Sequence, residues 1–190
     1  MDILLGICIG VSLSAASGFR VFVPPLVMSM AALSGYLTLA PGFEWIGTYE
    51  ALTAFAIATA IEVMGYYIPW LDHILDLLAT PIAVVTGTII TASMFSHPDP
   101  LLQWTVAVIA GGGSAGIFKS LTSLTRFVST GTTGGIANPI FSTIELGSSF
   151  VLSVLGIVLP TLTTLLLAIL VAFGIAKIWQ RRATKQQEQF

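Results

Sequence analysis

Two arginines lie next to long apolar stretches, where a guanidinium group needs either a partner or water. Arg20 and Arg126 each precede a segment that should break a helix: Val23-Pro24-Pro25 after the first, and a Gly/Thr-rich run ending in Asn138-Pro139 after the second. A broken helix leaves backbone N–H groups without partners, and a helix N-terminus favours negative charge. Arginine binds phosphate or carboxylate through a planar fork of donors. The pattern predicts a site for an anionic substrate that includes Arg20, Ser123, Arg126 and Asn138. In the alternative, each arginine reaches the membrane interface or pairs with an internal glutamate.

Two glutamates are candidates for proton coupling. Glu62 lies well inside an apolar stretch that begins at Ala51, and Glu145 opens the last apolar stretch of the chain. An intramembrane carboxylate is costly unless it is paired or faces water, and such groups form the proton relays of pumps and transporters. For Glu145, the alternative is a structural role at the start of a helix, where a negative charge complements the helix dipole.

The sequence gives weak support for a metal site. Asp72 and Asp76 are four residues apart, so they share one face of a helix, with His73 turned away. Two carboxylates on one face could hold a hard cation. Further ligands are missing from the pattern, so we expect solvated acids at the membrane interface instead. No nucleotide-binding, zinc-protease or dithiol motif occurs. We therefore expect no metal and no cofactor, and an enzyme has no support in the sequence.

The elements that must position these residues are membrane segments. Of 190 residues, 8% are charged and 55% are apolar, whereas an ordinary soluble domain has about 25% charged residues. Several charge-free stretches are long enough for a helix of about 20 residues to cross a bilayer. The composition excludes a soluble enzyme and a disordered chain. The net charge of −2 leaves no basic patch for nucleic acid, so the partner that we expect first is the lipid bilayer.

Prolines divide the apolar sequence. Because proline removes a backbone donor and clashes with the preceding turn, Pro24-Pro25 should break the first segment and Pro160 should kink or divide the last. The stretch 119–138 is too polar to face lipid. The expected membrane segments are 3–39, which is too long for one crossing, then 51–69, 81–94, 101–118 and 144–179.

We thus predict an all-α, polytopic integral membrane protein with four to seven spans and broken or re-entrant helices. The positive-inside rule places the polar tail, 180–190, in the cytoplasm, since it carries Arg181, Arg182 and Lys185. By the same rule, Lys119 and Arg126 suit the cytoplasmic side and the acidic loop 40–50 suits the outside. Six crossings satisfy all three placements. The expected location is the bacterial inner (plasma) membrane.

The chain also contains a candidate repeat. A shift of 106 residues superposes Gly6, Gly10, Ser14, Ser17 and Arg20 on Gly112, Gly116, Ser120, Ser123 and Arg126. These spacings place each set on one helical stripe. With three spans between the copies, we expect an inverted-topology repeat, with halves 1–100 and 101–179. The alternative is that both stripes are packing faces of unrelated helices.

Three motifs support a family resemblance. Ser-Gly-Phe-Arg-Val-Phe-Val-Pro-Pro-Leu (17–26), the run from Glu62 through Pro69 to Asp76, and the region 125–145 together resemble the membrane proteins of domain-of-unknown-function family 4126. The resemblance covers about residues 3–175 and implies a bacterial or plastid membrane protein without an established activity. Family members usually have an acid where this chain has Tyr66 or Tyr67, in an E-x-x-x-D-x-x-P pattern. This departure argues against a metal or carboxylate-pair role for Glu62.

In architecture alone, paired re-entrant segments with arginines and carboxylates resemble proton-coupled lipid-phosphate flippases. Together these features predict a membrane transporter or flippase-like protein for a small anionic or phosphate-bearing substrate, coupled to protons through Glu62 or Glu145. An oligomeric ion channel would instead line a pore with the Ser/Thr/Gly-rich segment. A non-transporting membrane scaffold or assembly factor would use the small-residue stripes only for packing, and a homo-oligomer is compatible with each reading.

Overall fold

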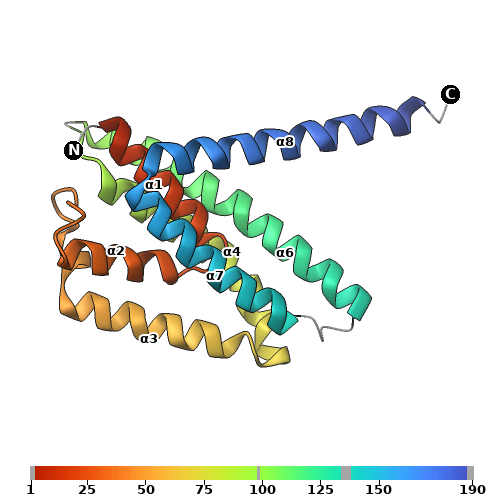
Figure 1. The fold of residues 1–190 in the computed structure, drawn as a ribbon, viewed down its shortest axis with the longest axis horizontal. Coiled ribbons are helices and arrows are strands. Elements are labelled where there is room, and N and C mark those ends of the chain that lie inside the picture. Colours follow the sequence, from red (N-terminus) through yellow and green to blue (C-terminus); the bar gives the residue numbers. More distant parts are fainter. Residues whose placement is uncertain (1–2, 98, 134–137, 188–190) are drawn as a thin grey trace.

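The structure, a computed structural model, describes residues 3–97, 99–133 and 138–187 (Figure 1). Every regular element in these residues is helical, which confirms the predicted all-α class. The helices are α1 (Ile3–Ser17), α2 (Val23–Leu33), α3 (Tyr49–Gly65), α4 (Pro69–Met94), α5 (Pro100–Val106), α6 (Gly113–Thr133), α7 (Asn138–Val158) and α8 (Pro160–Gln187). A short 3-10 helix, η1 (Glu44–Gly47), precedes α3, and a π-helical turn, η2 (Ala107–Gly112), joins α5 to α6.

Prolines set several helix boundaries. The first apolar segment is divided into α1 and α2, and Pro24 and Pro25 stand in the first turn of α2, where a missing N–H costs nothing. The last segment is likewise two helices, because α7 ends at Val158 and α8 begins at Pro160. Pro81 does not begin a helix as we expected. Instead it lies inside α4, which starts earlier, at Pro69.

Three helical stretches among the described residues are long and apolar enough to cross a membrane. They are Ile74–Met94, Pro100–Ser129 and Asn138–Val158. Three shorter apolar helices accompany them: Ile3–Ser17, Val23–Leu33 and Pro160–Gly174. These helices indicate a membrane protein, while the number of crossings stays a prediction.

Helix α1 occupies the centre of the bundle. It packs against α2, α4, α6, α7 and α8, whereas α3 lies at the edge of the bundle beside α2 (Figure 1). The C-terminal part of α8 extends away from the other helices. The end of α1, where Arg20 follows, is therefore surrounded by other elements.

The small-residue stripes of α1 and of η2–α6 both pack on α4. A Cβ atom added to Gly10 would lie 2.9 Å from Cα of Thr91, and one added to Gly116 would lie 3.2 Å from a methyl group of Val84. Gly6 lies against Met94, later in α4 than Thr91. Along both stripes, residues later in the stripe contact residues earlier in α4. Both stripes therefore run antiparallel to α4 and parallel to each other.

This orientation contradicts the inverted-topology repeat that we predicted for the two segments. Three helices, α2, α3 and α4, lie between the copies, so the chain turns four times and returns to its first direction (Figure 1). Our expectation of an opposite entry was wrong for this reason. That the two stripes are copies of one repeat, and the division of the chain into halves 1–100 and 101–179, stay predictions.

Helices α6 and α7 have polar faces inside and apolar faces outside. On α6 the buried side chains include Lys119, Thr122, Arg126 and Ser129, at intervals of three or four residues. On α7 they include Ser142, Glu145, Ser149 and Ser153. The exposed side chains of both helices are mostly apolar, among them Leu124, Phe127, Ile140, Ile144 and Val151. Such helices suit a lipid environment, where charged groups face the interior of the bundle.

The close approach of the α1 end to α6 depends on Gly18. A Cβ atom at this position would lie 2.6 Å from Cβ of Phe118 and 2.7 Å from the backbone nitrogen of Lys119. We expect Gly18→Ala to destabilise the protein by about 1–3 kcal/mol, because backbone atoms would have to move. Gly147→Ala is the matched control, since a Cβ atom there meets nothing within 4 Å. Thermal unfolding in detergent measures both variants, and equal midpoints would contradict this packing.

Candidate functional site

The structure brings Arg20 and Arg126 together inside the bundle. Arg20 follows α1 and is 1% exposed, and Arg126 lies on α6 and is 2% exposed. Both guanidinium groups lie against the ring of Tyr66, with Cζ atoms 4.0 Å and 4.3 Å from its centroid. Such contacts between a cation and an aromatic ring are attractive, more so away from water. One tyrosine at the end of α3 thus holds two arginines from distant parts of the chain.

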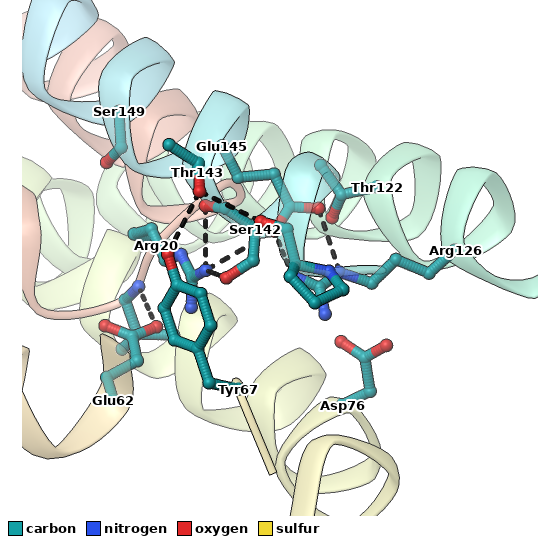
Figure 2. A network of polar contacts seen from close by, with 12 residues as sticks. Arg20, Glu62, Tyr67, Asp76, Thr122, Arg126, Ser142, Thr143, Glu145 and Ser149 are labelled. Atoms are coloured by element: carbon teal, nitrogen blue, oxygen red, sulfur yellow. Dashed lines mark hydrogen bonds and ion pairs between the residues drawn. The ribbon is translucent and has the colours of Figure 1, made fainter. Parts of the chain in front are cut away.

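Glu145 of α7 lies between the two arginines (Figure 2). Nε of Arg126 donates to Oε1 of Glu145 at 3.0 Å, and Nη2 of Arg126 donates to Oε2 in a second, shorter contact. Nη2 of Arg20 is 4.0 Å from the same Oε2. Pairing with an internal glutamate, the alternative in our sequence analysis, therefore applies fully to Arg126 and in part to Arg20.

Arg20 has donors that the described part of the protein does not satisfy. Its Nη2 donates to the carbonyl oxygen of Ser142 at 2.9 Å and to the hydroxyl of the same residue. Its Nε and Nη1 atoms are buried, and neither has a hydrogen-bond partner among the described residues. Because unsatisfied buried donors are costly and rare, these atoms point to a water molecule or an anion at this position.

The carboxylate of Glu62 binds the non-helical segment between α1 and α2. Its carboxylate accepts hydrogen bonds from the backbone nitrogens of Val21 at 2.9 Å and Phe22 at 3.1 Å. We expected these freed backbone groups to bind a substrate anion. In this structure an internal carboxylate takes that place, so this segment is stabilised by the protein itself. Glu62 lies one helical turn before Tyr66, and both reach the same region from α3.

Asp76 and Lys119 form a further ion pair beside the arginines. Nζ of Lys119 is 2.8 Å from Oδ1 of Asp76 and 5.9 Å from the centroid of the Tyr66 ring. Asp76 therefore neutralises a buried ammonium group. The side chain of Asp72 lies outside the described residues. Among the side chains that are described, no group of three His, Cys, Asp or Glu could hold a metal ion.

The burial of Lys119 and Arg126 corrects our topology argument. We counted both as charges on the cytoplasmic side, but both residues are 2% exposed. Both lie within the helical stretch Pro100–Ser129, which is long and apolar enough to cross a membrane. Since the positive-inside rule concerns loops, neither residue supports an orientation.

Asp76 and Lys119 should respond unequally to substitution. The Lys119 side chain is 2% exposed and that of Asp76 is 22% exposed. We expect Asp76→Asn to destabilise the protein by up to about 3 kcal/mol, because it leaves a buried ammonium group without its counter-ion. Lys119→Met should cost less, since water can reach the carboxylate that remains. Unfolding midpoints in the opposite order would show that the pair is not the main interaction of Lys119.

Ser123 and Asn138, the other two residues of the predicted anion site, differ in their hydrogen bonding. Asn138, at the start of α7, accepts a hydrogen bond from Ser129 through its Oδ1 atom at 3.2 Å. Ser123 lies on the same side of α6 as Arg126, three residues earlier. Its hydroxyl is buried and has no hydrogen-bond partner among the described residues. The structure therefore leaves Ser123 available and Asn138 engaged.

Sequence reasoning missed three members of the site: Tyr66, Lys119 and Ser142. Lys119 could have been found, because it precedes Arg126 by seven residues, which is two helical turns on one face. Ser142 precedes Glu145 by three residues and shares its face for the same reason. Tyr66 drew attention only as a departure from a pattern, and nothing in its spacing indicates contact with an arginine more than forty residues away.

Residues 7–180 match the family described as Domain of unknown function (DUF4126). The chain belongs to this family. The match confirms the resemblance that the three motifs indicated, and it includes every residue of the buried charge site. No curated protein and no solved structure gives a significant match. Membership of the DUF4126 family carries no activity with it, so function must be argued from the site.

Proposed function

We propose that the protein is a membrane transporter or flippase-like protein that moves a small anionic or phosphate-bearing substrate together with protons. The main support is the arginine site: two buried guanidinium groups share one carboxylate, and Arg20 keeps two buried nitrogens without partners in the described structure. Charged groups inside a membrane are costly and commonly serve transport. An anion bound to Nε or to Nη1 of Arg20 would form a charge-assisted hydrogen bond with an atom that has no partner among the described residues.

Glu145 is the proton-coupling group in this proposal. Its carboxylate contacts Arg126 and lies 4.0 Å from Nη2 of Arg20, so its negative charge would repel an anion bound to the same guanidinium group. When Glu145 takes up a proton from water, it loses the negative charge that competes with the substrate. The arginines then bind the anion, and loss of the proton expels it again. Substrate and proton therefore move in the same direction.

Glu62 has a positioning role in the same scheme. Both of its oxygens accept backbone hydrogen bonds, which fix the non-helical segment that precedes α2. Arg20 lies in this segment, so Glu62 determines where the guanidinium group stands. The substrate contacts Arg20 and Arg126, while Glu62 acts through the backbone next to Arg20.

For the cellular location, we propose the bacterial inner membrane with the C-terminus in the cytoplasm. Lys177, Arg181, Arg182 and Lys185 lie together near the end of the sequence. Under the positive-inside rule, such a cluster next to an apolar helix favours the cytoplasmic side. Because Lys119 and Arg126 lie inside the bundle and not in a loop, this orientation depends on the C-terminal cluster, together with the acidic loop 40–50.

Reconstitution of the full chain into phosphatidylcholine vesicles tests the transport proposal. The probes are radiolabelled inorganic phosphate and a fluorescent phosphatidic acid, each measured with and without an inward proton gradient. We expect at least one probe to move faster than in protein-free vesicles, and faster still with the gradient. If neither probe moves, the transport proposal is wrong. Single-channel currents in a planar bilayer would instead identify a channel.

A further inference from the structure

A pocket between α3 and α4 reaches the arginine site from the side of the bundle. Its volume is about 310 Å³, which lies at the lower end of the range for small-ligand sites. Its walls are apolar, with Ala58 and Ile61 from α3 and Leu78 and Ile82 from α4 among the lining residues. Glu62 and Tyr66 are the lining residues with polar side chains.

The mouth of this pocket faces the surroundings through apolar side chains. Ile61 is 59% exposed, Leu78 is 50% exposed and Ile82 is 41% exposed. The pocket exists because α3 packs mainly on α2 and touches α4 only lightly. In a bilayer, an opening lined in this way meets lipid chains.

Tyr66 separates the pocket from the arginines. Its side chain lines the pocket, and its ring contacts the guanidinium groups of Arg20 and Arg126. A movement of this one ring would join the apolar pocket to the guanidinium group of Arg20. The negative charge of Glu62 is already compensated by the N–H groups of Val21 and Phe22.

We infer that the substrate is an amphiphile drawn from the bilayer: a lipid phosphate whose anionic group binds Arg20 and whose apolar chain occupies the α3–α4 pocket. This inference rests on the proposed function and narrows its substrate to one source. Free phosphate gains nothing from apolar walls, whereas such walls let the chain of a lipid phosphate stay in apolar surroundings while its head group reaches Arg20. The substrate enters sideways between α3 and α4, and Tyr66 is the residue that must move.

Blocking the pocket after the protein has folded tests this inference. Cys8 is the single cysteine of the chain, so a Cys8→Ser background makes any new thiol unique. In this background, Ala58→Cys places a thiol in the pocket lining. Ala60→Cys is the matched control on the same helix, because Ala60 is exposed and lies outside the pocket lining. Both folded variants are reacted in detergent with N-benzylmaleimide, checked by mass spectrometry, and reconstituted into phosphatidylcholine vesicles.

The probes are again fluorescent phosphatidic acid and inorganic phosphate. We expect the labelled Ala58→Cys protein to move phosphatidic acid roughly tenfold more slowly than before labelling, and the labelled Ala60→Cys protein to be unchanged. If labelling at both positions has no effect, the pocket is not the entry route and the inference is wrong. If inorganic phosphate moves and phosphatidic acid does not, the inference is again wrong, but the proposed anion transport stands. If neither moves, both fail.

Discussion

Replacing Arg20 by Gln is expected to slow transport by about 10- to 100-fold, measured with whichever probe the wild type moves, inorganic phosphate or phosphatidic acid. The reason is that each charge-assisted hydrogen bond to the anion contributes about 1.5–3 kcal/mol. Arg20 is a cleaner target than Arg126. Glu145 keeps its close ion pair with Arg126 when Arg20 is replaced, so no carboxylate is left without a partner. The measurement is the initial rate of probe movement in vesicles that contain equal amounts of folded protein.

Arg20→Lys is the matched control for charge. Lysine keeps the positive charge but lacks the planar fork that reaches two oxygens at once. We expect Arg20→Lys to retain part of the activity and Arg20→Gln to retain almost none. Equal rates for the wild type and Arg20→Gln, in proteins that elute alike on gel filtration, would rule out Arg20 as a substrate contact.

The second large effect concerns stability, and it should be asymmetric. Among the described residues, the Glu145 carboxylate lies near two guanidinium groups, whereas Arg126 pairs with a carboxylate that also has Arg20 nearby. Removing one partner of a buried pair costs about 3–5 kcal/mol. We expect Glu145→Gln to reach this range, since it removes the negative charge that stands close to both guanidinium groups. Arg126→Gln should cost less.

A double-mutant cycle isolates the pair itself. The double variant Arg126→Gln with Glu145→Gln should be more stable than the sum of the single effects implies, by about 1–3 kcal/mol. Thermal unfolding in one detergent, followed by circular dichroism, supplies all four values. Additive effects would show that the two side chains do not interact in the folded protein, whatever their separation in the structure.

Several features of the fold could be read from the sequence because they depend on local chemistry. Pro24-Pro25 and Pro160 stand in the first turns of helices because proline cannot continue a preceding helix, so both breaks were predictable. The apolar stretches between sparse charges gave the membrane class. The orientation of the repeated stripes was predictable as well. Three passes between the copies mean four reversals of direction, so the span count that we assumed implies parallel copies rather than inverted ones.

The charged residues of the site could be predicted from the sequence, but the pairs that they form with one another could not. Arg20, Glu62, Arg126 and Glu145 stand out because charges are rare in apolar sequence. Which acid meets which base depends on how five helices pack, and a spacing pattern carries no such information. The sequence therefore predicted that Glu62 is functional, but only the structure shows that it binds the backbone of Val21 and Phe22 rather than an arginine.

The end of α3 has a consequence for how the protein can be observed. Glu62 binds the α1–α2 break, Tyr66 lies against the arginines, and the hydroxyl of Tyr67 shares a 3.0 Å hydrogen bond with that of Thr143 on α7 (Figure 2). A tilt of α3 would thus break several of these contacts in the same event. The amide protons of Val21 and Phe22, which Glu62 protects, would then exchange with deuterated solvent at a rate set by that tilt. Deuterium exchange at these two backbone amides would therefore report how fast the site around the two arginines opens.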